Sequence, residues 1–295
     1  MNKHELGYAL GRQPNDPRQP RVRLRALPKT AVTAPPSADW LTGVPAWGMA
    51  LNDQIGCCTM SGAAHVARAV NHFGRNDDTP IPDDAVLAGY EAVSGYKPGK
   101  PSTDVGATLQ DALGYWRATG LAGNRIAAFA EIDAQNLTLV RACIAIFGAV
   151  YTGMNFPASA MDQFDSGKPW SVVKRSSIEG GHCVPIGAYD DESFACVTWG
   201  QVQPMTLDFY KRYFDEVWVP IDLDWLTATG ASPAGLDTDA LNVDYQALTG
   251  EPGPFPQATP PVTPPTNPPP VGPPDQDIDL ELATAVRLWL AAKKL

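Results

Sequence analysis

The chain has 295 residues, enough for one large domain or two smaller ones. An apolar fraction of 44% and a charged fraction of 18% are typical of a globular protein and exclude disorder over the whole length. The net charge of −10 argues against a general nucleic-acid binder, because phosphate contacts require lysine and arginine.

Residues 1–35 form a basic arm interrupted by prolines. Its cations outnumber its two acids, Glu5 and Asp16; they are Lys3, Arg12, Arg18, Arg21, Arg23, Arg25 and Lys29. One interpretation is a solvated tail that lies across the following domain. The other is a contact with an acidic surface or a nucleic acid, which is expected nowhere else in the chain.

Residues 36–247 have the pattern of one domain that mixes helices and strands. Apolar periodicity and stop signals predict helices at 58–70, 109–119 and 137–147, and then strands at 149–154, 182–189 and 194–199. Helices come first and strands dominate later. This segregation predicts an α+β fold rather than alternating βαβ units.

The C-terminal part differs in composition. Twelve prolines fall between 252 and 274, which predicts an extended linker over 248–274. Residues 275–295 are predicted to form an amphipathic helix, with an apolar stripe of Ile278, Leu282, Val286 and Trp289, and Leu290 at its edge. We expect 278–290 to dock on a protein partner or on a second copy, the alternative being that the helix folds back on its own domain.

The cysteines and the apolar stretches limit the setting of the protein. An odd number of cysteines without a CxxC pair indicates neither a disulfide framework nor a zinc site. The longest apolar stretch, 142–150, is shorter than the ~20 residues that span a bilayer, and 1–10 has no signal-peptide core. We therefore expect no membrane association, no metal and no secretion by a signal peptide.

One cysteine stands at a position suited to nucleophilic chemistry. Cys58 begins the predicted helix 58–70, where the positive end of the helix dipole favours a thiolate. A base is also needed, and the chain has four histidines. His65 lies seven residues along the same helix, roughly 10 Å away, while His4 and His72 are in the arm and farther on. His182 opens a predicted strand after two glycines and is the histidine best placed to serve.

Other polar and sulfur-containing residues have structural interpretations. His65 is expected to be a hydrogen-bonded core histidine, and Trp199 to pack against the histidine His182. Cys57 is expected to be buried packing, with a redox role for the Cys57–Cys58 pair as the alternative. Cys183 and Cys196 are expected in strand cores. The acidic pairs are expected to be solvated turns; they are Asp77–Asp78, Asp83–Asp84 and Asp190–Asp191.

Several short motifs, in order, resemble the papain-like cysteine peptidases. Residues 36–40 (Pro-Ser-Ala-Asp-Trp) resemble the opening of the mature domain, and Cys58 follows at the family's spacing. Residues 181–184 (Gly-His-Cys-Val) resemble the strand of the catalytic histidine, 148–151 (Gly-Ala-Val-Tyr) an earlier strand, and 197–200 (Val-Thr-Trp-Gly) the Asn-Ser-Trp-Gly segment. The similarity is greatest to the divergent bacterial and phage branch and covers about 36–220.

The resemblance implies a two-lobed fold, with a helical lobe that carries the nucleophile helix and an antiparallel β lobe. It implies Cys58 as nucleophile, His182 as base, and an amide that binds the oxyanion. The family's oxyanion glutamine corresponds to Asn52, six residues before Cys58, but Gln54 is the alternative and is slightly favoured. The family's orienting asparagine corresponds to Val197, so Thr198 is the candidate substitute.

The leading hypothesis is thiol-dependent hydrolysis of a peptide or related amide bond in a peptide or protein substrate, without a cofactor. The alternative is a papain-fold structural or interaction protein with weakened chemistry, such as a component of a phage particle, that docks through 278–290. The corresponding location is the cytoplasm of a bacterial host or a virion. For the active site we expect Cys58 and His182 to come within reach and Thr198 to be the polar group of 194–199 nearest the imidazole.

Overall fold

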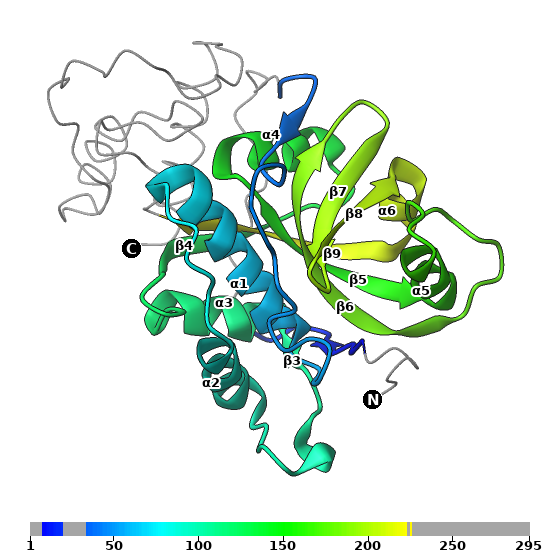
Figure 1. Ribbon diagram of the computed structural model, residues 1–295. Coiled ribbons are helices and arrows are strands. Elements are labelled where there is room, and N and C mark those ends of the chain that lie inside the picture. The colour runs from blue at the N-terminus through cyan, green and yellow to red at the C-terminus, as the bar shows by residue number, and fades with distance from the viewer. Residues whose placement is uncertain (1–7, 20–33, 223–224, 226–295) are drawn as a thin grey trace, which may run out of the picture.

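The computed structural model describes residues 8–19, 34–222 and 225 (Figure 1). Part of the basic arm, the predicted linker 248–274 and the predicted helix 275–295 lie outside the described residues. The expectations for these segments therefore stay predictions.

Six α-helices are present in the described part of the chain. They are α1 (Cys58–Val70), α2 (Asp83–Ser94), α3 (Leu109–Ala118), α4 (Leu137–Phe147), α5 (Ala158–Asp165) and α6 (Leu207–Tyr213), with a π turn at Asn71–Arg75 and a 3₁₀ turn at Pro101–Thr103. Side-chain oxygens of Thr108, Asn136 and Thr206 cap α3, α4 and α6 by accepting a backbone N–H in the first turn.

The strands form one large antiparallel sheet and one small pair. The order in the large sheet is β4-β9-β5-β6-β7-β8, with β2 added at one end of β6. Its strands are β2 (Ala38–Asp39), β4 (Ile126–Ile132), β5 (Val150–Pro157), β6 (Ile178–Tyr189), β7 (Ser193–Thr198), β8 (Gln201–Thr206) and β9 (Phe214–Asp222). The small parallel pair joins β1 (Arg12–Gln13) to β3 (Ala107–Thr108).

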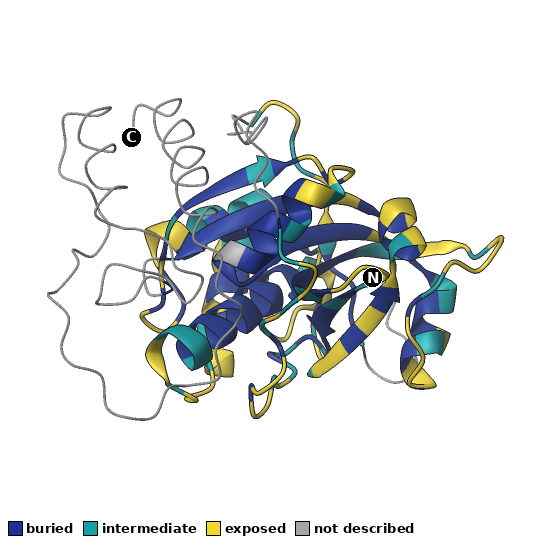
Figure 2. Ribbon diagram, turned by 90° about the horizontal axis from the view of Figure 1, so that it is seen from above, coloured by how far each residue is buried: buried dark blue, intermediate teal, exposed yellow. Residues whose placement is uncertain are grey.

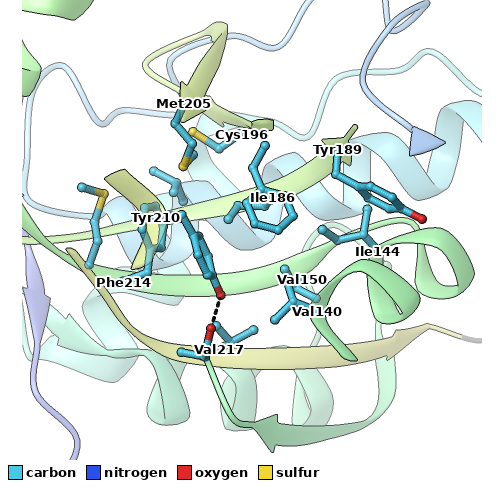
Figure 3. Close-up of a cluster of buried hydrophobic side chains, with 14 of the residues drawn as sticks. Val140, Ile144, Val150, Ile186, Tyr189, Cys196, Met205, Tyr210, Phe214 and Val217 are labelled. Atoms are coloured by element: carbon cyan, nitrogen blue, oxygen red, sulfur yellow. Dashed lines mark hydrogen bonds between the residues drawn. The ribbon is translucent and has the colours of Figure 1, made fainter. Parts of the chain in front are cut away.

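Two hydrophobic cores divide the domain into two lobes. One core joins the sheet to α4, α5 and α6, and Figure 3 shows part of it, where the hydroxyl of Tyr210 donates to the carbonyl of Ala134 at 3.0 Å. The other core joins α1, α2 and α3 to the opposite face of the sheet, through residues such as Tyr151 and Trp218. Figure 1 shows α1 running between α2 and α3 on one side and the sheet on the other.

Helix α1 is buried along its whole length (Figure 2). Its small residues allow this close approach: a Cβ on Gly62 would lie only 3.1 Å from the Tyr151 ring and 3.3 Å from the sulfur of Cys183. The hydroxyl of Tyr151 also donates to the carbonyl of Thr59 at 2.5 Å. These contacts fix the first turn of α1, and hence Cys58, against β5 and β6.

The predicted α+β class and two-lobed architecture are confirmed. Helices α1 and α4 have the predicted bounds, whereas β6 begins at Ile178, four residues earlier than predicted. The interpretation of Asp83–Asp84 as a solvated turn is wrong. Both acids are exposed but form the first turn of α2, where the helix dipole favours carboxylates.

Candidate active site

Cys58 is the first residue of α1 and is 1% exposed. The loop before it is held by Asp104, whose carboxylate accepts the N–H of Gly56 at 3.0 Å and the hydroxyl of Tyr90 at 2.6 Å. The same Tyr90 hydroxyl accepts the N–H of Gly106 at 2.9 Å. This buried network joins the loop before Cys58 to the loop before β3.

Backbone N–H groups on both sides of the thiol surround it. The N–H of Cys183, the residue after His182, and the N–H of Gly11 from the arm are near the Cys58 sulfur, and both favour its thiolate. Burial nevertheless raises the pKa of Cys58 to about 11, although these donors and the positive Arg12 act in the opposite direction. In this arrangement the thiol is protonated at neutral pH.

The His182 imidazole is held on one side by a hydroxyl and on its face by an indole. Its Nε2 lies 2.8 Å from Oγ1 of Thr198. The ring stacks on Trp199, with centroids 4.6 Å apart and an interplanar angle of 16°, and Phe156 meets it edge-on. Burial lowers the pKa of His182 to about 3, so the ring is neutral at neutral pH.

Consecutive residues of one strand do not ordinarily reach the same ring, because side chains alternate across a sheet. Here Trp199, directly after β7, has a φ of +44°, in the left-handed region that bulky residues rarely adopt. This turn in the backbone lets both Thr198 and Trp199 contact His182. Strain of this kind costs about 1–3 kcal/mol and is typical of functional sites.

Cys58 begins α1 and His182 lies on β6, and no hydrogen bond joins the two in the described part of the chain. Cys183 lies at the thiol, whereas Nδ1 of His182 is buried and has no hydrogen-bond partner among the described residues. The Thr198 hydroxyl can either donate or accept, so it is compatible with a tautomer in which Nδ1 is free to take a proton.

The two oxyanion candidates differ in their surroundings. Asn52 is buried, and its Nδ2 donates to the carbonyls of Ala9 at 2.9 Å and Ile55 at 3.3 Å. The side chain of Gln54 is exposed. Of the two amides, only that of Asn52 contacts polypeptide lying in the cleft.

Residues 8–13 of the arm occupy the cleft between the lobes. Ala9 exchanges hydrogen bonds with Asn52, and the N–H of Ala107 donates to the carbonyl of Gly11 at 2.9 Å. A Cβ on Gly11 would lie 1.8 Å from the carbonyl oxygen of Gly56, so only glycine fits there. The arm is therefore packed against the loop that precedes Cys58.

The arm also covers the histidine side of the site. The ring of Tyr8 stacks on the indole of Trp199, and the Tyr8 and Trp199 ring centroids are 4.9 Å apart. The same indole stacks on His182. Arg12 places its guanidinium 2.8 Å from carboxylate oxygens of Asp215 and Glu216. A pocket of about 340 Å³ remains beside the arm, lined by residues 10–13, 104–105 and 179–181.

Most of the structural interpretations of single residues are confirmed. His65 is buried with Nε2 3.0 Å from the carbonyl of Gly48, and Trp199 packs against His182. The sulfur of Cys57 is buried 3.2 Å from the hydroxyl of Ser61, and Cys183 and Cys196 are buried strand residues. Among the residues described, no cluster of His, Cys, Asp and Glu could hold a metal ion.

Sequence reasoning missed the residues that shape the cleft. Asp104, Glu216 and Gly11 lie far from Cys58 in the chain, and none belongs to a recognisable motif. A weak signal existed in the glycines around the arm contacts, Gly153 and Gly181, but glycine alone does not say what approaches it. The contact of the arm with these two glycines becomes visible only in the tertiary structure, where the two lobes lie together.

Comparisons with known proteins agree with this architecture. Neither a protein-family model nor a curated protein sequence matches the chain. The structure is similar to that of xylellain, a cysteine protease from Xylella fastidiosa, with a TM-score of 0.58 and 15% identity over 75% of this chain and 98% of that one. A cysteine protease of Carica candamarcensis has a TM-score of 0.42, 12% identity, and coverage of 63% and 98%. The similarity to xylellain, together with the two lobes and the antiparallel sheet, shows that the chain has a papain-like fold.

No helix in the described ranges combines the length and the apolar character needed to cross a bilayer.

Proposed function

We propose that the protein hydrolyses peptide bonds through the thiol of Cys58. The observation that carries the proposal is the arrangement of His182 beside the nucleophile helix. One imidazole nitrogen is held by Thr198, the ring is stacked on Trp199, and the other nitrogen has no hydrogen-bond partner among the described residues. Cys58 at the start of α1 gains thiolate stabilisation from the helix dipole once it is no longer covered.

In the first half of the reaction, Nδ1 of His182 takes the thiol proton and the sulfur forms a bond to the substrate carbonyl carbon. The negative oxygen of the tetrahedral intermediate accepts hydrogen bonds from the backbone N–H of Cys58 and from Nδ2 of Asn52. We favour Asn52 over Gln54 because its amide already donates to a carbonyl of the polypeptide in the cleft. The C–N bond then breaks, and His182 returns its proton to the leaving amine.

In the second half, water attacks the thioester while His182 accepts one of its protons. The C–S bond breaks, the carboxylic acid leaves, and the sulfur regains a proton from His182. No cofactor takes part. Thr198 acts as a positioning residue that holds the imidazole plane.

With the arm in the cleft, this chemistry is blocked. Both reacting groups are neutral, and the N–H of Gly11 and the ring of Tyr8 lie where substrate must bind. The proposed function therefore includes an opening step in which residues 8–13 leave the cleft before any substrate is cleaved.

The test is cleavage of an unfolded protein substrate by the full chain carrying Gly11→Ala, which cannot keep the arm in place. Fragments are identified by mass spectrometry. Cys58→Ser is expected to abolish cleavage, and the matched Cys57→Ser, which alters the neighbouring thiol, is expected to retain it. If the Gly11→Ala chain does not cleave the substrate, or if cleavage survives in both Cys58→Ser and Cys57→Ser, the result contradicts a thiol hydrolase and favours an interaction protein.

A further inference from the structure

The side chain of Arg12 lies in a trough whose floor is made of glycine backbone. A Cβ on Gly153 would lie 2.6 Å from Nε and 2.9 Å from Cζ of Arg12. A Cβ on Gly181 would lie 3.2 Å from Cδ and 2.4 Å from the carbonyl oxygen of the same residue. The absence of side chains at these two positions makes room for a long side chain and for the backbone that carries it.

The trough ends at two carboxylates. Nη2 of Arg12 lies 2.8 Å from Oε2 of Glu216 and 2.8 Å from Oδ1 of Asp215. The side chain of Glu216 is 5% exposed, whereas that of Asp215 is 46% exposed. A carboxylate as buried as Glu216 requires a cationic partner, because an unpaired charge in such surroundings is costly.

The cationic partner of Glu216 comes from the arm and not from the domain. Among the described residues, the groups that hydrogen-bond to Glu216 are the indole N–H of Trp218, the amide of Asn15 and the guanidinium of Arg12. Trp218 belongs to the domain but is neutral. When the arm leaves, the carboxylate loses its charge partner, and a cation of whatever enters the cleft can take that place.

The trough is adjacent to the reacting thiol. Glu216, Gly153 and Cys183 occupy one row of the sheet, on β9, β5 and β6. Neighbouring strands are about 4.8 Å apart, so Glu216 lies roughly 10 Å from Cys183. The N–H groups of Cys183 and of Gly11 are both near the Cys58 sulfur and favour its thiolate. The residue whose side chain fills the trough is therefore next in the chain to the residue at the thiol.

We infer that this trough is a specificity site, which selects an arginine side chain in the polypeptide bound in the cleft and which Arg12 fills while the arm is in place. The inference rests on the proposed function and names its substrate class. Arginine is favoured over lysine because its planar guanidinium lies against the backbone of Gly153 while its Nη2 contacts Glu216 and Asp215 together, whereas lysine has no planar group to fill that space.

The first experiment measures binding rather than cleavage. A fluorescein-labelled peptide of residues 8–19 is titrated, by fluorescence polarisation, into the full chain carrying Gly11→Ala and Cys58→Ser. A second peptide has citrulline, the uncharged isostere, in place of Arg12. We expect the arginine peptide to bind about tenfold to a hundredfold more tightly, the range for a charged hydrogen-bond partner.

The matched variants remove one negative charge each. Glu216→Gln, added to the same chain, is expected to abolish the preference for arginine over citrulline. Asp84→Asn, on the exposed start of α2, is expected to leave it intact. Equal affinity for the two peptides, or a preference that survives Glu216→Gln, overturns the inference.

Cleavage then separates this inference from the proposed function. When the Gly11→Ala chain digests an unfolded protein mixture, we expect arginine to be enriched at one fixed position beside the cut sites. Cleavage without that enrichment overturns the inference but leaves the hydrolase standing. Arginine-selective binding without any cleavage supports the specificity site and contradicts the hydrolase.

A second measurement covers the case in which Gly11→Ala does not fold. In the otherwise natural chain, Arg12→Lys and Arg12→Ala are compared by hydrogen exchange of residues 8–19. Exchange that is slowest with arginine at position 12, faster with lysine and fastest with alanine supports selection of arginine. Equal exchange in all three overturns it.

Discussion

Replacing Gly11 with alanine is expected to release the arm from the cleft while leaving the domain folded. The added Cβ would lie 1.8 Å from the carbonyl oxygen and 2.4 Å from the carbonyl carbon of Gly56. Both atoms are backbone, so no side-chain rotation relieves the overlap. The arm has to move, because Gly56 is fixed by its hydrogen bond to Asp104.

The size of the effect follows from the contacts that are lost. Ala9 and Asn52 exchange two hydrogen bonds of 2.9 Å, and Gly11 accepts a third of 2.9 Å from Ala107. At about 1 kcal/mol each, the three contribute about 3 kcal/mol to docking of the arm. Their loss increases the population of the open form by about a hundredfold.

Hydrogen exchange with mass spectrometry measures this opening directly. Exchange of residues 8–19 is expected to accelerate by about a hundredfold, provided that exchange occurs through arm opening. The alkylation rate of Cys58 by iodoacetamide is expected to rise with it, since the same movement uncovers the thiol. Gly114→Ala is the matched control, because a Cβ at that position has nothing within 4 Å. Unchanged protection of the arm in Gly11→Ala, or equal loss in both variants, would show that the close contact with Gly56 does not hold the arm.

Three further predictions follow from the site. Thr198→Val, measured on peptide cleavage in the Gly11→Ala chain, is expected to lower kcat by about tenfold or more because His182 loses its partner at Nε2, whereas Thr198→Ser retains most of the rate; equal rates in all would remove Thr198 from the site. Alkylation of Cys58 in the closed chain is expected to rise tenfold per pH unit up to a pKa of about 11, and a plateau near pH 8 would contradict its burial. Burial lowers the pKa of His65 from 6.5 to about 4. Its neutral imidazole therefore contributes about 3 kcal/mol to the free energy of unfolding, which is present above pH 6.5 and is lost as the pH falls through 4. Urea unfolding of His65→Gln should show a smaller loss of stability over that interval.

The sequence alone determined the elements whose signals are local. Periodic apolar residues and a stop at Gly148 defined α4, and a run of small residues defined α1. The spacing of short motifs selected Cys58 and His182 from five cysteines and four histidines. The helix predictions succeed because helix periodicity is a property of neighbouring residues, whereas the roles of Cys58 and His182 stay predictions.

Only the tertiary structure decided how the site is closed and what it contains. The arm, expected to be a solvated tail across the domain or a contact with an acidic surface or nucleic acid, brings Gly11 near the thiol and Arg12 to Glu216, a residue 204 positions away in the chain. The contact of both Thr198 and Trp199 with His182 depends on one positive φ that no residue pattern announces. Such contacts are set by strand register and by the packing of two lobes, and the energy that selects them is distributed over the whole domain. Local sequence therefore carries little record of them.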